Sequence, residues 1–310
     1  MKLCPLCQQN KSRTIATLYD TRYGNPEEYA VLQCGSCTHL YTWPVPDEIK
    51  LRKLYEENYT PEVEDNRLQL TSATDSMNLA AKYRSLIHRF WRKLSGLPDL
   101  IQYARMGKIL DYGCSTGGLL PLMAGLGFEP FGLEFNPIAA QKAQRLGYEV
   151  FCGRIEESPW TDGYFDTIIL SQVIEHLVAP IDTLREIAKK LKPDGRLIVA
   201  CPNAGSLYRH LFGRYWAHWH VPFHLQHFNK HSLKFVAEEA GLTVKRLFAI
   251  TPNYWLIMSW RIWRTDERGR QNHAIKCPMP LSQKFFASLL SRFFDVSGKG
   301  DCLIAVFEKG

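Results

Sequence analysis

The sequence predicts an α/β protein built on a doubly wound parallel sheet, with a small cysteine-bearing module at its N-terminus. Three observations predict this architecture. Short apolar runs alternate with amphipathic runs from about residue 107 onward, which is the order of strands and helices in a parallel sheet. A glycine-rich turn joins the first of these strands to a helix. Two Cys-x-x-Cys pairs, Cys4/Cys7 and Cys34/Cys37, precede the main domain.

Composition is that of an ordinary globular protein. Of 310 residues, 45% are hydrophobic and 22% charged, and no low-complexity tract or internal repeat is present. The first residues lack the apolar core of a signal peptide, and no window reaches the roughly 18 apolar residues of a membrane span. We therefore expect a cytoplasmic protein, whose nine cysteines are thiols or metal ligands rather than disulfides. The net charge of +7 is spread along the chain and only weakly indicates an anionic partner.

The first module spans residues 1–46. Its two cysteine pairs are separated by 26 residues, and four thiolates in paired spacing predict a tetrahedral, structural zinc site. Coincidental thiol pairs and a redox Cys-x-x-Cys are the less favoured readings, because no thioredoxin-like unit surrounds either pair. We expect His39, two residues beyond the last cysteine, to be a surface residue rather than a ligand. Pro44 and Pro46 end the module.

The pattern of residues 47–106 predicts a helical linker or lid. One helix is expected around Ile49, Leu51 and Leu54. A second is predicted by apolar residues at three- and four-residue steps, namely Leu79, Tyr83, Leu86, Ile87, Phe90, Trp91 and Leu94. We expect this stripe to pack against the main domain, with a lid over a cofactor site as the sharper alternative. Gly96 and Pro98 should end the helix.

The glycine-rich turn follows an apolar strand that starts at Lys108. The strand ends in Asp111, and Gly113-x-x-x-Gly117 leads into a helix expected over 119–124. Glycines at such a turn let the backbone approach a ligand. The spacing differs from the dinucleotide-binding fingerprint, in which the acidic residue lies far downstream.

The alternation continues through four more strands. They are expected at 131–134, 148–151, 165–170 and 196–200, with helices at 137–146 and 179–191. Glu134 ends the second strand, where a carboxylate can accept both hydroxyls of an adenosine ribose. This acid alone also suits NAD, so it does not distinguish between the two cofactors.

From about Gly107 to Gly310 the chain resembles class I methyltransferases that use S-adenosylmethionine (SAM). The resemblance rests on the Asp111-to-Gly117 turn, on Glu134, on Phe165-Asp166, and on the Glu-His-Leu and Lys-Pro-Asp-Gly segments that flank the helix at 179–191. It implies a seven-stranded, mostly parallel sheet with a sixth strand at 242–250 and an antiparallel seventh at 301–308. A helical insertion would then occupy about 252–298.

The resemblance also assigns the SAM site. The residues implied are Asp111, Gly113, Cys114, Ser115, Gly117, Glu134, Phe135, Ile155 and Ser171. Two positions depart from the family pattern. Ser115 replaces the middle glycine of the turn, and its hydroxyl could bond the amino-acid end of SAM. Arg154 stands where many relatives carry an acid facing adenine, which leaves the backbone of Ile155 for that contact.

Two histidines are the candidate catalytic residues. The segment Pro222-x-His224-Leu-x-x-Phe resembles a motif of a branch that includes glycan, sugar and quinone methyltransferases, and it lies in a loop with three further histidines. We predict that His224 acts as a base or orients the acceptor, with His176 second. Spacing places Gln172, Glu175 and His176 on one helical face. The simpler reading for each histidine is a hydrogen bond within the loop. The alternative is a divalent metal near Glu175. Gln172 argues against this alternative, because the relatives that bind a metal carry an acidic residue at the position of Gln172.

Two aromatic segments, 253–263 and 285–294, lie within the helical insertion. We expect two packed helices, with peripheral membrane contact as the alternative. The predicted activity is methyl transfer from SAM to a small-molecule acceptor such as a sugar, glycan or quinone-like intermediate. The alternatives are an RNA methyltransferase that uses the zinc module, and a non-catalytic module with a SAM-like fold. A nucleic-acid acceptor is disfavoured because the basic residues are not gathered into a stripe. A nicotinamide oxidoreductase is disfavoured by the glycine spacing.

Overall fold

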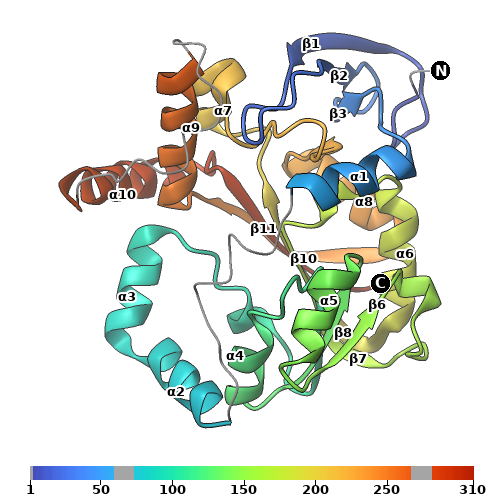
Figure 1. Ribbon diagram of the computed structural model, residues 1–310, viewed down its shortest axis with the longest axis vertical. Helices are drawn as coiled ribbons and strands as arrows, with labels where there is room; N and C mark the ends of the chain where they lie inside the picture. The colour runs from blue at the N-terminus through green and yellow to red at the C-terminus, as the bar shows by residue number, and fades with distance from the viewer. Residues whose placement is uncertain (1–2, 59–72, 267–280) are drawn as a thin grey trace.

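The computed structural model describes residues 3–58, 73–266 and 281–310, which form two sheets surrounded by helices (Figure 1). The larger sheet has the strand order β10-β11-β8-β7-β4-β5-β6. Its strands are β4 Lys108–Tyr112, β5 Glu129–Glu134, β6 Glu149–Cys152, β7 Phe165–Ser171, β8 Leu191–Pro202, β10 Leu242–Ile250 and β11 Cys302–Lys309. Strands β4 to β8 are parallel, and β11 runs antiparallel to both β8 and β10. The predicted seven-stranded, doubly wound sheet is confirmed, including its antiparallel last strand.

Strand β4 marks the point where the winding of the sheet reverses. It pairs with β5 on one side and with β7 on the other, so that Tyr112 lies opposite Leu133 and Leu170. In open α/β sheets, ligands bind outside the carboxyl ends of the strands at such a switch point. The glycine-rich turn leaves β4 at this place.

Several helices of the main domain begin at residues whose side chains cap them. Asn136 accepts the amide hydrogens of Ile138 and Ala139, and Pro137 takes the first helical position. Asn229 and Ser232 form a reciprocal capping box. The helices are α4 Leu120–Gly125, α5 Pro137–Gln144, α6 Pro180–Lys190, α7 Leu207–Phe212, α8 Lys230–Glu239, α9 Asn253–Asp266 and α10 Leu281–Val296. Among the described residues, no helix is long and apolar enough to cross a membrane.

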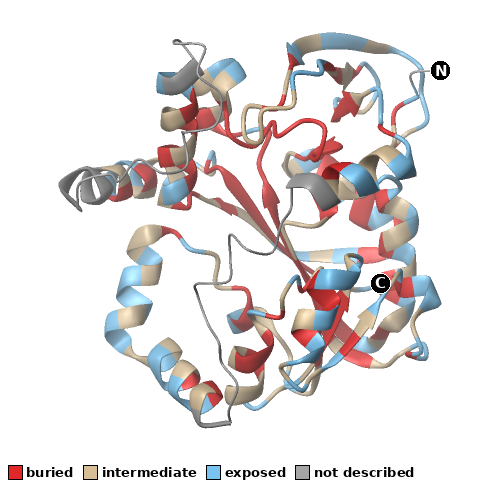
Figure 2. Ribbon diagram, viewed as in Figure 1, coloured by how far each residue is buried: buried red, intermediate tan, exposed pale blue. Residues whose placement is uncertain are grey.

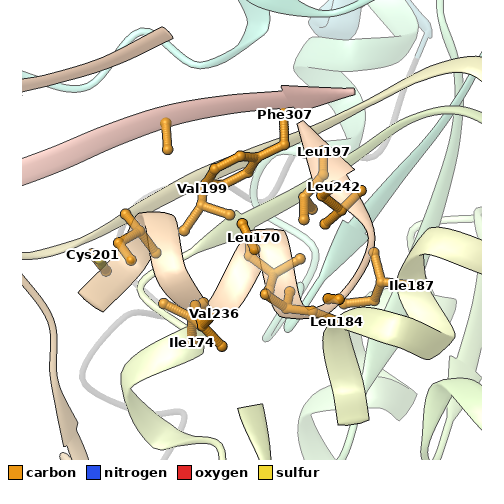
Figure 3. Close-up of a cluster of buried hydrophobic side chains, with 14 of the residues drawn as sticks. Leu170, Ile174, Leu184, Ile187, Leu197, Val199, Cys201, Val236, Leu242 and Phe307 are labelled. Carbon is orange, nitrogen blue, oxygen red and sulfur yellow. The ribbon is translucent and has the colours of Figure 1, made fainter. Parts of the chain in front are cut away.

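Alternating strand residues feed two hydrophobic cores, one on each face of the sheet. Leu170 belongs to the core with α6 and α8, whereas its neighbour Ile169 belongs to the core with α4 and α5. Figure 3 shows the first core, where Leu184 of α6 and Val236 of α8 meet the sheet. Full burial of each such side chain stabilises the fold by about 1.5–3 kcal/mol.

The smaller sheet has the order β1-β2-β3-β9, and its strands are antiparallel. Three strands come from the N-terminal module, namely β1 Ser12–Leu18, β2 Tyr29–Cys34 and β3 Leu40–Trp43. The fourth, β9 Gln226–His227, belongs to the histidine-rich loop of the main domain. The module therefore shares its sheet with the segment that carries the candidate catalytic residues.

The described helices of the linker are α1 Glu48–Asn58, α2 Ala73–Arg84 and α3 Leu86–Ser95, and residues 59–72 lie outside the description. The apolar stripe expected over one helix is divided at Ser85, which has an extended backbone (φ −55°, ψ 132°). Helix α2 lies against α4, and its Ala80 is buried. Helix α3 has no buried residue, so the expected packing against the main domain is wrong for this half of the stripe. Gly96 ends α3 with a φ of 64°, as predicted.

Candidate active site and zinc centre

The glycine turn after β4 is tightly packed against the protein itself. Gly113 has a φ of +80°, and a Cβ atom there would lie 2.6 Å from Cγ2 of Val173. Gly117 has a φ of +83°, and its Cβ would lie 3.0 Å from the side chains of Ala143 and Leu146. Ser115, the residue that departs from the family pattern, adopts a φ of +50° between them. The turn thus needs glycine at both positions for conformation and for space.

Glu134 at the end of β5 is tied to this turn. Its two carboxylate oxygens accept the amide hydrogens of Ser115 and Asn136, each at 2.8 Å. Burial raises the pKa of Glu134. Burial also raises the pKa of Asp111 to about 7, and the charge of Glu134 adds to that shift. A carboxylate offers about four lone pairs, so Glu134 retains acceptor capacity for ribose hydroxyls after holding the turn.

The structure brings the residues expected at the cofactor site to one edge of the sheet. They follow β4, β5, β6 and β7, which are neighbours in the sheet. Phe135 is exposed, whereas Cys114 and Ile155 are buried. Burial raises the pKa of the Cys114 thiol, which makes it a packing residue rather than a reactive one. Ser171 is half-buried at the end of β7.

Helix α1 connects this edge with the histidines. The guanidinium of Arg52 lies 6.0 Å from the ring centre of Phe135. One turn further along α1, the hydroxyl of Tyr55 lies 2.8 Å from Nδ1 of His176. The lid expected from the 79–94 stripe is therefore better matched by α1. Tyr55 was missed because an exposed-looking tyrosine in a helical run carries no local signal of a distant partner.

His176 and His224 lie edge to face, with ring centres 4.9 Å apart. Nδ1 of His176 lies 2.9 Å from the carbonyl oxygen of Phe223, and Nδ1 of His224 lies 2.8 Å from that of His218. A carbonyl oxygen only accepts, so each Nδ1 carries the hydrogen and each Nε2 keeps its lone pair. At His176, the hydroxyl oxygen of Tyr55 faces the same Nδ1 hydrogen. Burial lowers the pKa of His176 to about 4 and that of His224 well below the usual 6.5. Both rings are therefore neutral near pH 7.

Glu175 completes a cluster with these two histidines. One ligand-capable atom from each of the three residues lies within 4.8 Å of the others. Neither carboxyl oxygen of Glu175 has a hydrogen-bond partner within the described ranges, and burial raises the pKa of this residue to about 8. Near pH 7 Glu175 therefore carries its proton. On losing that proton to a bound cation, it would form with the two neutral imidazoles a ligand set that suits a divalent transition metal. The cluster can therefore hold a cation or a polar group of an acceptor.

The expected helical face that joins Gln172 to Glu175 and His176 is not present. Gln172 has a φ of +60°, and only Ile174–His176 form a short 3₁₀ helix. The side-chain Nε2 of Gln172 donates to Sγ of Cys302 at 3.9 Å. A sharp turn at the end of β7 separates the amide from the cluster, so the helical periodicity assumed for this segment was wrong.

The N-terminal module holds the histidine loop in place. The hydroxyl of Thr42 donates to the carbonyl oxygen of His224 at 2.7 Å, and the Thr42 amide donates to Leu225 at 3.0 Å. His39 is fully buried, with Nε2 2.9 Å from the side-chain oxygen of Gln226. The expectation that His39 is a surface residue is wrong, because β9 covers it.

Two further contacts complete the surroundings of the loop. The ring centre of Tyr23, in the turn between β1 and β2, lies 5.5 Å from that of His220. Asp301, at the start of β11, is buried and accepts hydrogen bonds from Ser206 Oγ at 2.7 Å and from Trp216 Nε1 at 2.8 Å. Neither residue was expected at the site, because both are brought there only by tertiary packing.

The four cysteines of the module converge as the spacing predicts. Sγ of Cys4 lies 3.5 Å from Sγ of Cys37, and Cys7 and Cys34 are the same distance apart. All four sulfurs lie within 4.8 Å of one another. Zinc–sulfur bonds of about 2.3 Å in a tetrahedron place the sulfurs about 3.8 Å apart. The four thiols therefore fit a structural zinc ion.

The two aromatic segments of the insertion differ in burial. In α9, Trp255 and Ile262 are buried as expected for a packed helix, whereas Tyr254 and Trp263 are exposed. In α10, the described side chains Leu289, Leu290 and Phe293 are exposed. The side chains of residues 285 and 286 and the insertion residues 267–280 lie outside the described structure.

The family model described as a methyltransferase domain matches residues 77–247, more than half of the chain. A ubiquinone biosynthesis O-methyltransferase of Pseudomonas aeruginosa is 28% identical over 203 residues, which cover 56% of this chain and 86% of that protein. The mitochondrial ubiquinone biosynthesis O-methyltransferase of Schizosaccharomyces pombe is 34% identical over 101 residues, covering 30% of this chain and 37% of the yeast protein.

A tRNA U34 carboxymethyltransferase of Desulfotalea psychrophila is 32% identical over 137 residues, 41% of each protein. The chain thus spans less than half the length of two of these three relatives. Among solved structures, a SAM-dependent methyltransferase from Thermotoga maritima, described as a possible histamine N-methyltransferase, aligns with a TM-score of 0.50 and 15% identity. It covers 84% of this chain and 100% of the other, and this likeness concerns the fold alone.

Proposed function

We propose that this chain, which belongs to the family described as a methyltransferase domain, transfers a methyl group from SAM to a hydroxyl group of a small acceptor bound beside His224 and His176. The observation that carries the proposal is the state of these two imidazoles. Each Nδ1–H is paired with a main-chain carbonyl oxygen, which leaves each Nε2 as an acceptor. His176 follows β7, which pairs with the switch-point strand β4, and His224 of the histidine-rich loop packs against its ring.

We propose that SAM is held by the residues around the glycine turn. Glu134 would accept the ribose hydroxyls with the lone pairs that Ser115 and Asn136 leave unused. Asp111 and the backbone of the turn from Gly113 to Gly117 would hold the methionine part. SAM supplies a methyl group on a positively charged sulfur. The protein aligns the acceptor oxygen with that methyl group.

O-methylation releases one proton from the acceptor hydroxyl. A neutral imidazole can first accept a hydrogen bond from this hydroxyl, which orients it, and can then take the proton as the new carbon–oxygen bond forms. Burial lowers the pKa of His176 to about 4, so this imidazole is a weak base. It would therefore contribute to the reaction more by orienting the acceptor hydroxyl than by accepting its proton. The cluster with Glu175 also fits a divalent cation, and such an ion would hold the acceptor oxygen instead.

A sugar, glycan or quinone-like molecule is the acceptor class we propose. The similarity to two ubiquinone biosynthesis O-methyltransferases supports a hydroxyl acceptor. An RNA acceptor is the alternative, supported by the similarity to a tRNA U34 carboxymethyltransferase and by the net charge of +7. The zinc module favours a small-molecule acceptor. Its strand β3 pairs with β9 of the main domain, so this edge of the module's sheet is covered by the protein and is not available to a nucleic acid.

The test compares His224→Ala and His176→Ala with wild type. SAM affinity is measured by calorimetry, and methyl transfer is measured from labelled SAM to panels of quinone-like phenols, sugar nucleotides and tRNA. We expect SAM affinity to stay within about twofold and transfer to fall by about 10²–10⁴-fold. His231→Ala, an exposed histidine on α8, is the matched control. Unchanged transfer by His224→Ala would remove the histidine from the site, and transfer to tRNA alone would replace the small-molecule proposal.

A second arm separates a proton-accepting histidine from a metal ligand. Transfer is measured with and without added Mg²⁺, Mn²⁺ or Zn²⁺, and Glu175→Gln is included. If the histidines act without metal, the added ions leave the rate unchanged. A rate that requires one ion in wild type, and that in Glu175→Gln falls and needs more of that ion, would assign the cluster to a cation instead.

A further inference from the structure

Helix α3 carries an apolar face that is open to solvent along its whole length. Leu86 is 78% exposed, Ile87 68%, Phe90 62% and Trp91 53%. At 100° per residue these four side chains, together with Leu94, occupy one continuous arc of the helix. Figure 2 shows α3 coloured as exposed and intermediate, in contrast to the buried sheet. Four large, exposed apolar side chains on one helix form a patch that is typical of an interaction surface.

The opposite arc of α3 is basic; Arg92 on this arc packs on the protein, whereas Arg89 and Lys93, at the margin of the apolar face, are exposed. The guanidinium of Arg92 lies 3.7 Å from the ring centre of Tyr83 and donates to the Tyr83 carbonyl oxygen at 3.2 Å. It also lies 3.4 Å from a carboxylate oxygen of Asp99. The usual arrangement, in which the apolar face of a surface helix turns toward the core, is therefore reversed in α3.

A depression of about 290 Å³ lies beside this basic arc. Arg84, Arg89 and Arg92 line it together with Asp99, Leu126 and Phe128. Asp99 pairs with Arg92, and the other two arginines are exposed. From Lys82 to Leu97 the chain contains five basic residues besides His88 and no acidic residue. An anionic group is the chemical complement of such a depression.

We propose that α3 lies flat on the surface of an anionic phospholipid bilayer, with its apolar face among the acyl chains and its basic flank against phosphate groups. An exposed helix with aromatic and aliphatic residues on one face and arginine and lysine on the other is typical of interfacial helices. A second copy of the chain would offer the same positive charge rather than the opposite one. An anionic bilayer supplies both an apolar layer and negative charge.

Helix α10 lies beside α3 and extends the same type of surface. The Arg292 guanidinium donates to the carbonyl oxygen of Lys93 at 3.0 Å, which joins the two helices. Beyond this contact, α10 exposes Leu289, Leu290 and Phe293. The site of membrane contact therefore centres on the linker helix, and not on α9. The proposal does not depend on the identity of the methyl acceptor.

The test is co-sedimentation of the full chain with phosphatidylcholine vesicles and with vesicles that also contain phosphatidylglycerol. Wild type should bind the anionic vesicles, and its affinity for them should fall as salt is added, because the basic flank contributes an electrostatic attraction that salt screens. The double variant Phe90→Ser/Trp91→Ser should lower the affinity at least about tenfold. Arg89→Gln should lower it about fivefold, the effect of one lost charge near an anionic surface.

Leu211→Ser, on a residue of α7 that is also exposed, is the matched control and should bind as wild type does. Retained SAM affinity in each variant shows that it is folded. The proposal is overturned if wild type ignores anionic vesicles, or if Phe90→Ser/Trp91→Ser binds them as tightly as wild type. It is equally overturned if wild type is a dimer by light scattering, the double variant is a monomer, and neither binds vesicles.

Discussion

Replacing Asp301 by asparagine should make the stability of the protein less sensitive to pH. Asp301 is completely buried, and its Oδ1 accepts hydrogen bonds from Ser206 and Trp216. Its Oδ2 lies 3.7 Å from Nε2 of His218 and has no hydrogen-bond partner in the described structure. An asparagine oxygen can take the place of Oδ1 and keep both bonds, while the change removes the ionisable group.

The size of the effect follows from the pKa of Asp301. Burial raises this pKa from the ordinary 3.8 to about 7, although the hydrogen bonds from Ser206 and Trp216 oppose the shift. Between these two values the unfolded chain has lost the proton and the folded protein has kept it, so the unfolding free energy falls as the pH rises. Wild type should lose about 2 kcal/mol relative to Asp301→Asn between about pH 5 and about pH 7, and the difference should level off above about pH 8.

Urea unfolding of both proteins at a series of pH values measures this difference. Asp162→Asn, at a carboxylate with 70% side-chain exposure, serves as the control and should follow wild type at every pH. Parallel profiles for wild type and Asp301→Asn would refute the reasoning. A loss of stability of Asp301→Asn relative to wild type as the pH rises would also refute it. That result would mean that Asp301 in the wild-type protein is ionised and paired with a charged His218. Burial instead lowers the pKa of His218 to about 3, which keeps that ring neutral.

Three other variants address the glycine turn, the cysteines and the contact between the sheets. Gly113→Ala should weaken SAM binding at least about tenfold in calorimetry, because its φ is +80° and the new Cβ would lie 2.6 Å from Val173. Cys37→Ser should lose zinc, as measured by elemental analysis, and lower the melting temperature, because it removes one of four converging sulfurs. Thr42→Val should destabilise the protein by about 1–3 kcal/mol and slow methyl transfer at unchanged SAM affinity, because the carbonyl oxygen of His224 loses its donor.

Each of these variants has a control variant of the same residue type that should behave as wild type. Gly118→Ala is the control for the turn, because a Cβ there meets nothing within 4 Å. Cys152→Ser removes an exposed thiol, and Thr17→Val removes an exposed hydroxyl of β1. Equal SAM affinity of the two glycine variants, one zinc per chain in Cys37→Ser, or full activity of Thr42→Val would each contradict the corresponding prediction.

The sequence was sufficient to predict the sheet and the edge where the cofactor residues gather. Parallel strands joined by helices place their carboxyl ends together, so Asp111 and Glu134 had to become neighbours once their strands were recognised. The four cysteines were equally predictable, because their spacing is that of a metal site and the distances between their sulfurs agree.

The residues around the histidines could not be predicted in the same way. Thr42 meets His224 across 182 positions of the chain, and Tyr55 meets His176 across 121. Such pairings arise from tertiary packing and leave no periodic trace in a window of ten or twenty residues. For the same reason, the apolar stripe from Leu79 to Leu94 predicted helix correctly but could not tell the buried Ala80 side of α2 from the exposed face of α3.

The shared sheet β1-β2-β3-β9 imposes an order on folding during synthesis. The four cysteines leave the ribosome within the first 37 residues and can close around zinc early, but the third strand waits for Gln226 and His227 to complete its edge. Until then, the hydroxyl of Thr42 and the imidazole of His39 lack the partners that they have in the finished protein. Contacts of such long sequence separation form late. We infer that the histidine loop becomes ordered only when nearly three quarters of the chain has been made, and that an isolated methyltransferase domain without its first 46 residues would lose the order of that loop.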